Sequence, residues 1–151
     1  MRILVVDDSA FMRKALSQMI ASEPGLEVID TARNGKDAVA KALALKPDVI
    51  TMDVEMPEMN GIDALREIRR VCPDPKPAVI MCSSLTSAGS HEALLALRLG
   101  AADIVAKEAS IQTGNLDTLR NDLIGKIKAL GGVSSRRAHR RMVTRFMYLC
   151  N

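Results

Sequence analysis

Five polar residues in this sequence each follow a short apolar run and could act together as reagents: Asp7, Asp8, Asp53, Ser83 and Lys107. Three carboxylates in one pocket repel one another at a cost on the order of several kcal/mol per close pair. Such a cluster is tolerated if one acid is protonated, if the acids stay apart in water, or if a hard cation lies between them. A small oxygen-rich site that also keeps water molecules suits Mg²⁺ better than a softer metal.

This mixture of groups indicates phosphoryl transfer. A carboxylate nucleophile, a divalent ion, an ammonium group and a hydroxyl are the parts needed to accept a phosphoryl group and bind its oxygens. In this interpretation Asp53 attacks phosphorus in line, Lys107 pairs with one phosphoryl oxygen and Ser83 donates to another. The simpler interpretation of Asp7 and Asp8 is a solvated turn pair that caps the next helix.

The elements that must position these residues follow from the hydrophobic pattern. Apolar runs alternate with segments of helical period, which predicts strands at 3–6, 26–29, 48–52, 78–82 and 104–106. Predicted helices follow each strand, over about 9–23, 35–46, 61–72, 90–99 and 116–130. Five such units predict an α/β domain, a parallel sheet of order 2-1-3-4-5 with helices on both faces. Ligands bind at the C-terminal edge of such a sheet, where the polar residues should converge. Asp30 and Thr31, at the end of the outer second strand, are expected to lie outside the group.

Composition excludes several classes of protein. The 151 residues are 48% hydrophobic and 26% charged, as expected for one globular domain. No apolar run approaches the ~20 residues that span a bilayer, and the N-terminus turns acidic where a signal peptide would not, so a cytoplasmic location is expected. Glycine-rich nucleotide-binding and serine-hydrolase motifs are absent. The three cysteines have neither metal-ligand nor redox-pair spacing and are expected to be reduced.

Charge is distributed unevenly along the chain. From Ser134 onward there are five arginines and no acid, whereas residues 1–133 hold 16 basic and 18 acidic groups. We therefore expect a domain over residues 1–131 and a basic tail over 132–151. The tail is either a solvated linker remnant or a basic amphipathic segment that docks on an acidic partner, a lipid surface or the domain's own acidic pocket. Without a recognisable reading module, no specific nucleic acid binding is expected.

The stretches LVVDDSAFMRKAL, DVITMDVEMPEMNG, SSLT and GAADIVAK resemble the receiver domain of bacterial response regulators, over residues 2 to about 130. The resemblance implies the (βα)5 flavodoxin-like receiver fold, and it implies that Asp53 takes phosphate from a sensor histidine kinase. It also implies that Asp8, Asp53 and the backbone carbonyl of Glu55 bind Mg²⁺ directly, with Asp7 acting partly through water. Lys107 would be the switch lysine.

By the same resemblance Ser83 would be the switch hydroxyl, with Ser84 as the alternate. Two positions depart from the family pattern: Glu108 replaces the usual proline after the switch lysine, and Ile104 replaces a common aromatic residue. The output surface would be formed by the fourth helix, the fifth strand and the fifth helix. Met56, in the loop after Asp53, is interpreted as partly exposed.

Within the family the sequence is most similar to the receiver half of chemotaxis protein-glutamate methylesterases, which implies chemotaxis-type signalling. Those enzymes carry a separate catalytic domain after the receiver. Only about twenty residues follow the last predicted helix, so we expect no methylesterase activity from these 151 residues, and no enzymatic activity beyond self-phosphorylation and autodephosphorylation.

Three alternatives remain open. The first is a phosphatase-type enzyme that uses Asp53 as a turnover nucleophile, with Glu55 as a second acid. The second is a phosphorylation-independent interaction module, which the acidic Glu108 beside the switch lysine would favour. The third is the regulatory half of a methylesterase without its catalytic domain.

Overall fold

The structure is a computed structural model and describes residues 1–83, 91–107 and 115–131. Its centre is a five-stranded sheet of order β2-β1-β3-β4-β5 in which all neighbouring strands are parallel. The strands are β1 (Arg2–Val6), β2 (Glu27–Ala32), β3 (Val49–Asp53), β4 (Ala78–Ser83) and β5 (Asp103–Ala106). The predicted α/β fold class and strand order are therefore confirmed.

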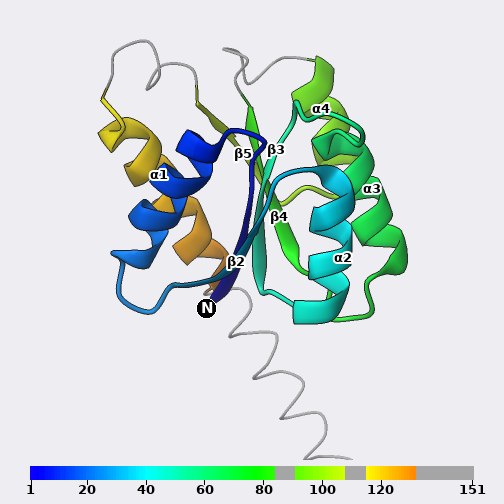
Figure 1. The fold of residues 1–151 in the computed structure, drawn as a ribbon, viewed down its shortest axis with the longest axis horizontal. Coiled ribbons are helices and arrows are strands. Elements are labelled where there is room, and N and C mark those ends of the chain that lie inside the picture. The colour runs from blue at the N-terminus through cyan, green and yellow to red at the C-terminus, as the bar shows by residue number, and fades with distance from the viewer. Residues whose placement is uncertain (84–90, 108–114, 132–151) are drawn as a thin grey trace, which may run out of the picture.

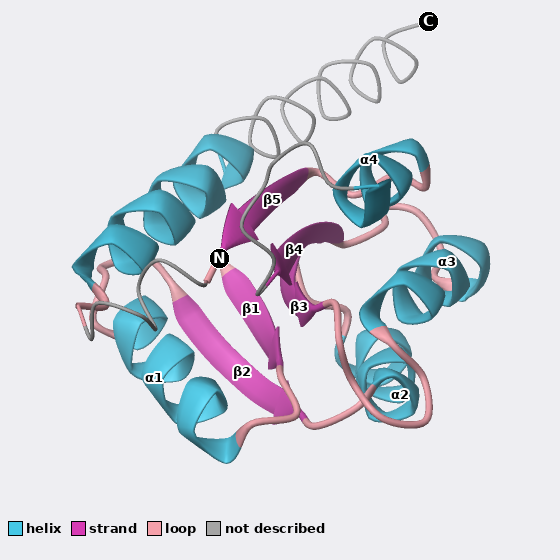
Figure 2. Ribbon diagram, turned by 90° about the horizontal axis from the view of Figure 1, so that it is seen from above, coloured by secondary structure: helices cyan, strands magenta, loops and turns pink. Residues whose placement is uncertain are grey.

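Helices cover both faces of the sheet (Figures 1 and 2). They are α1 (Ala10–Ala21), α2 (Gly35–Leu45), α3 (Gly61–Val71), α4 (His91–Arg98) and a helical segment over 117–131. The first and last of these lie on one face, and α2, α3 and α4 lie on the other. No helix in the described part of the chain has both the length and the apolar character needed to cross a membrane.

Three helices begin at the edge where the strands end. The side chains of Ser9, Asn34 and Asn60 accept hydrogen bonds from backbone N–H groups in the first turns of α1, α2 and α3. These caps satisfy N–H groups that have no partner inside the helix, and they fix where each helix starts. The positive ends of the three helix dipoles therefore face the C-terminal edge of the sheet.

The core has two halves, one on each side of the sheet. Along β1, Leu4 and Val6 are buried under α2, α3 and α4, whereas Ile3 and Val5 are buried under α1 and the last helix. This follows from the two-residue period of a strand. Cys72 and Cys82 are buried and free, as expected for reduced cysteines, while Cys150 lies outside the described residues together with the whole predicted tail 132–151.

Two details differ from the sequence prediction. The second strand does not end at residue 29 but continues to Ala32, because Asp30, Thr31 and Ala32 pair with β1 through the backbone, whatever the polarity of their side chains. Met56 is buried at 9% exposure, because the loop after β3 folds back on the core beneath α2 and α3.

Candidate functional site

Three carboxylates meet at the C-terminal ends of β1 and β3. Asp7 and Asp8 directly follow β1, Asp53 is the last residue of β3, and these strands are neighbours in the sheet. One oxygen from each of the three lies within 4.8 Å of the others. Asp7 and Asp53 are only 1% and 5% exposed, whereas Asp8 is exposed to solvent. The structure thus brings together the predicted acids, with one of them accessible from outside.

Lys107 lies between the two buried acids. Its Nζ is 2.8 Å from Oδ2 of Asp7 and 3.1 Å from Oδ1 of Asp53. The lysine directly follows β5, is 4% exposed, and its backbone N–H donates to the carbonyl of Ser83 at 2.7 Å. A lysine 54 positions after Asp53 in the chain reaches it because β3, β4 and β5 are successive strands of the sheet.

Burial and neighbouring charges shift the pKa values of Asp53 and Lys107 in this site. The pKa of Asp53 is raised to about 7, first by burial and further by the charge of Asp7, although Lys107 opposes the shift. Burial alone would lower the pKa of Lys107, but its hydrogen bond to Asp7 and the charge of Asp53 raise that pKa above its usual value. The ammonium therefore stays charged, and one cation faces two buried acids and a third exposed one.

The backbone and side chain of Asp7 are held at several points. Its Oδ1 accepts from the N–H of Ser9 at 2.9 Å, and its own N–H donates to the carbonyl of Ala32 at 3.1 Å. Nη1 of Arg13 donates to the carbonyl of Asp7 at 2.8 Å. Asp7 is therefore a fixed member of the cluster, since both its carboxylate and its peptide groups are engaged.

The remaining predicted residues lie nearby. Ser83 is buried at 6% exposure and ends β4 beside Cys82, which is the register partner of Asp53. Glu55 is exposed, and its side chain is outside the three-carboxylate cluster, but it lines with Asp8 a pocket of about 440 Å³. Ser84 and Glu108 lie outside the described residues.

The closest contact of Gly61 is not evident from the sequence. A Cβ at this position would lie 2.0 Å from the carbonyl oxygen of Asp53, a separation that no side chain could occupy. The N–H of Gly61 also donates to the carbonyl of Val54 at 2.8 Å. The start of α3 thus packs directly on the backbone of β3, and a side chain at position 61 would prevent that packing. The Asn60-Gly61 pair, a cap followed by glycine, is a signal that could have suggested this.

The donor set fits Mg²⁺. Three carboxylate oxygens are grouped within 4.8 Å, two of the acids are buried, and Lys107 supplies less positive charge than the cluster needs. Hard oxygen ligands and surplus negative charge are what a small divalent cation requires.

The family model for the response regulator receiver domain matches residues 3–116. Protein-glutamate methylesterase/protein-glutamine glutaminases are similar to the chain: the protein of Symbiobacterium thermophilum is 45% identical over 89% of the chain and 36% of its own length. That of Alkalilimnicola ehrlichii is 48% identical over 87% of the chain and 33% of its own length. The chain spans about a third of the length of these curated relatives.

Solved structures agree with the curated relatives. The response regulator domain of Thermotoga maritima CheB is 44% identical, with a TM-score of 0.77, and the match covers 86% of this chain and 95% of that one. A chain of the CheX-CheY-BeF3-Mg²⁺ complex of Borrelia burgdorferi is 33% identical, with a TM-score of 0.63, over 78% of this chain and 88% of that one.

Proposed function

The chain belongs to the response regulator receiver family, and on this premise we propose that Asp53 accepts a phosphoryl group from a sensor histidine kinase and so switches the domain. The observation that carries the proposal is the group formed by Asp7, Asp8 and Asp53, with Lys107 in contact with both buried acids. A buried, backbone-fixed carboxylate beside a single ammonium is suited to nucleophilic attack at phosphorus.

A carboxylate oxygen of Asp53 forms a bond to phosphorus while the bond from phosphorus to the donor nitrogen breaks, and the imidazole leaves with that electron pair. Lys107 can then turn an N–H from Asp53 toward a new phosphoryl oxygen, because an ammonium has three donors. Ser83 ends the adjacent strand β4, and its hydroxyl is the group that we propose donates to another phosphoryl oxygen.

The Asp7, Asp8 and Asp53 carboxylates and the carbonyl of Glu55 are the groups that would hold Mg²⁺. When bound, the ion supplies positive charge that balances the transferring group. Asp53 must be ionised to attack, and a neighbouring dication lowers the pKa that burial has raised to about 7. The structure of Borrelia CheY with BeF3 and Mg²⁺ supports this assignment by analogy.

The output surface that we propose consists of α4, β5 and the helix over 117–131. Leu94 and Leu97 of α4 are 50% and 45% exposed, and Ile104 of β5 is half-buried against the core beneath α4. A phosphoryl group that draws on Ser83 and Lys107 acts at the ends of β4 and β5, next to this surface. Because its relatives are methylesterases and glutaminases, we place the chain in cytoplasmic, chemotaxis-type signalling as part of the same proposal.

The proposal is tested by incubating the chain with a small phosphodonor such as phosphoramidate, with and without Mg²⁺, and measuring intact mass. We expect one added phosphoryl group that depends on Mg²⁺ and is absent from Asp53→Asn. Asp103→Asn is the matched control, because Asp103 begins β5 and so lies at the opposite end of the sheet's strands from the cluster. Labelling that persists in Asp53→Asn would contradict the assignment.

The same sample separates a switch from a phosphatase. A switch is expected to hydrolyse its own phosphoryl group and to show no sustained turnover of added phosphate esters. Multiple turnovers that depend on Asp53 and Glu55 would instead support the enzyme.

A further inference from the structure

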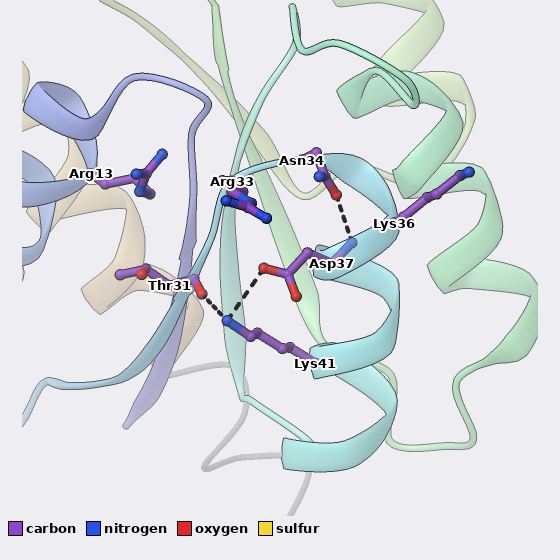
Figure 3. A pocket seen from close by; sticks show the side chains of 7 residues that line it. All are labelled: Arg13, Thr31, Arg33, Asn34, Lys36, Asp37 and Lys41. Carbon is purple, nitrogen blue, oxygen red and sulfur yellow. Dashed lines mark hydrogen bonds and ion pairs between the residues drawn. The ribbon is translucent and has the colours of Figure 1, made fainter.

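A second pocket, of about 620 Å³, lies at the β2 side of the same sheet edge (Figure 3). Its walls come from the first turn of α1, the end of β2 and the start of α2. The charged residues that line it are Arg13, Arg33, Lys36, Lys41 and Asp37. Thus four basic groups and one acid surround the cavity, on a domain whose first 133 residues carry a formal charge of −2 from 16 basic and 18 acidic groups.

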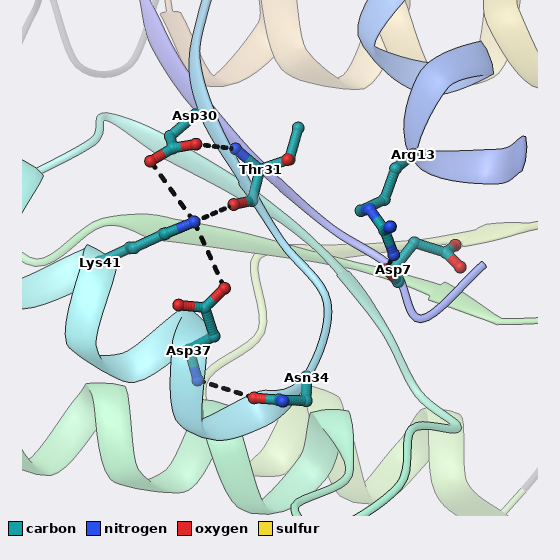
Figure 4. Close-up of polar contacts among 7 residues, drawn as sticks. All are labelled: Asp7, Arg13, Asp30, Thr31, Asn34, Asp37 and Lys41. Carbon is teal, nitrogen blue, oxygen red and sulfur yellow. Dashed lines mark hydrogen bonds and ion pairs between the residues drawn. The ribbon is translucent and has the colours of Figure 1, made fainter. Parts of the chain in front are cut away.

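Lys41 is the basic group whose charge is already balanced. Its Nζ lies 3.4 Å from Asp30 and 3.3 Å from Asp37, and it also donates to the carbonyl of Thr31 (Figure 4). These contacts connect the end of β2 to the first two turns of α2. Lys41 therefore forms part of the wall and holds it in place, which leaves the other basic groups to attract a ligand.

The three other basic side chains lack an acidic partner among the described residues. Arg13 donates to the backbone carbonyl of Asp7, which is a neutral acceptor. Within the described part of the chain, the side chains of Arg33 and Lys36 make neither an ion pair nor a hydrogen bond, and both residues are exposed. The side chain of Lys36 points away from Arg13 and Arg33 (Figure 3), so the two guanidinium groups are the free cations beside the cavity. Like charges repel each other, and a bound anion would relieve that repulsion.

The geometry of the pocket favours phosphate over other anions. Two guanidinium groups can each bind phosphate oxygens through two parallel N–H donors. The N-terminus of α2, capped by Asn34, adds the positive end of a helix dipole to the same wall. Among the described residues that line the cavity, every side chain is polar or charged and none carries an aromatic ring, so the contacts offered to a ligand are ionic and hydrogen-bonding ones.

We propose that this pocket binds a compact anion with two phosphate groups, held by Arg13 and Arg33. The two guanidinium groups and the volume of about 620 Å³ both exceed what a single phosphate would use. The pocket is separate from the cluster of Asp7, Asp8, Asp53 and Lys107, which we call the acceptor site. Neither Asp53 nor a metal takes part in the pocket. It nevertheless adjoins that site, because Arg13 holds the carbonyl of Asp7 and the N–H of Gly35 donates to the carbonyl of Met59 in the loop after β3.

The test is a calorimetric titration of the full chain carrying Asp53→Asn with inorganic pyrophosphate, at low salt and with EDTA present. These conditions remove both phosphorylation and metal-bound phosphate, so the outcome does not depend on the proposed function. We expect saturable binding of one pyrophosphate with a Kd below about 1 mM. Failure to saturate by about 20 mM would overturn the proposal.

The residues are tested by single substitutions that keep the side chain long and polar. Arg33→Gln is expected to weaken pyrophosphate binding roughly tenfold, because it removes a charge-assisted contact. Lys14→Gln is the matched control, because Lys14 is exposed and adjoins Arg13 on α1 but does not line the pocket. An equal loss in Lys14→Gln would show nonspecific attraction and would contradict the proposed site.

The source of the phosphate is distinguished by comparing ligands on the same protein. ATP is expected to bind within about threefold of inorganic triphosphate, because the pocket recognises phosphate alone. ATP binding more than about tenfold tighter than triphosphate would contradict a purely phosphate-directed site. Tighter binding of an oligoglutamate peptide than of pyrophosphate would assign the pocket to an acidic protein partner and overturn the proposal.

Discussion

The acceptor site and the basic pocket lie at the same edge of one sheet, yet they treat charge in opposite ways. At the acceptor site Asp7, Asp53 and Lys107 are almost fully buried, and their positions are fixed by short contacts. In the basic pocket Arg33 and Lys36 are exposed and, among the described residues, have no partner. The acceptor site has a surplus of negative charge and the basic pocket a surplus of positive charge, but only the acceptor site has most of its charged groups buried away from water.

The difference in burial indicates which charges the stability of the fold depends on. A buried charge without a partner is costly, so each member of the acceptor site should affect stability. Exposed charges are screened by water and salt, so those of the basic pocket should affect binding but hardly affect stability.

The largest expected effect comes from removing the buried cation. Lys107→Met leaves Asp7 and Asp53 facing each other without the ammonium, and we expect it to lower the free energy of unfolding by about 3 kcal/mol without Mg²⁺. Urea denaturation measures this change. Lys128→Met is the control, since its ion pair with Glu23 is at the surface and should be worth less than about 1 kcal/mol. Similar losses in the two variants would show that burial does not distinguish the sites.

The next effect concerns the tight backbone contact at the acceptor site. Gly61→Ala places a methyl group where the carbonyl of Asp53 lies, so we expect a loss of about 2–3 kcal/mol and a lower rate of phosphoryl incorporation. Gly125→Ala is the matched control, because a Cβ there meets no atom within 4 Å and alanine favours a helix. If Gly61→Ala were as harmless as Gly125→Ala, α3 would not be held against β3 in this way.

A smaller effect depends on pH. The folded state keeps the proton of Asp53 up to about pH 7, whereas an unfolded aspartate loses it near pH 4, so the wild type should lose stability as the pH rises between these values. Asp53→Asn lacks this loss. Without Mg²⁺ we expect the variant to be more stable than the wild type by about 2 kcal/mol near pH 8 and to show little difference near pH 4. Denaturation at both pH values checks this, and a constant difference would contradict it.

The smallest effect is expected in the basic pocket. Arg33→Gln and Lys36→Gln should each change the free energy of unfolding by less than about 0.5 kcal/mol, because their side chains are exposed. The same denaturation assay measures both variants. A loss above about 1 kcal/mol in either variant would mean that these charges support the fold and would remove the contrast with the acceptor site.

The sequence could predict the acceptor site because each of its residues directly follows or ends an apolar strand. Asp53 and Lys107 could be predicted to lie close together without coordinates. Parallel strands end at the same edge of the sheet, and the strand order fixes which of those ends are near one another. The apolar run of β2 stops at residue 29 and so underestimates the strand, because Asp30 and Thr31 are polar and belong to it through backbone pairing with β1. Hydrophobic pattern carries no information about such residues at an outer strand.

The basic pocket was also beyond sequence reasoning. Arg13, Arg33 and Lys36 belong to three separate parts of the chain, and each alone resembles an ordinary solvated residue. They share a cavity only because α1 and α2, on opposite faces of the sheet, both begin at the edge where β1 and β2 end (Figure 1). The same limit applies to Gly61, whose contact with the carbonyl of Asp53 depends on the path of the loop between them.

Asp53 is the residue that we propose carries the phosphoryl group. The most direct test is to phosphorylate the chain with phosphoramidate and Mg²⁺, reduce the product with borohydride, and map the modified peptide by mass spectrometry. Reduction converts an aspartyl phosphate to homoserine, and we expect homoserine at position 53 and at no other acidic residue. Homoserine at Asp7 or Asp8, or a phosphoryl group that survives reduction on Ser83, would contradict the account.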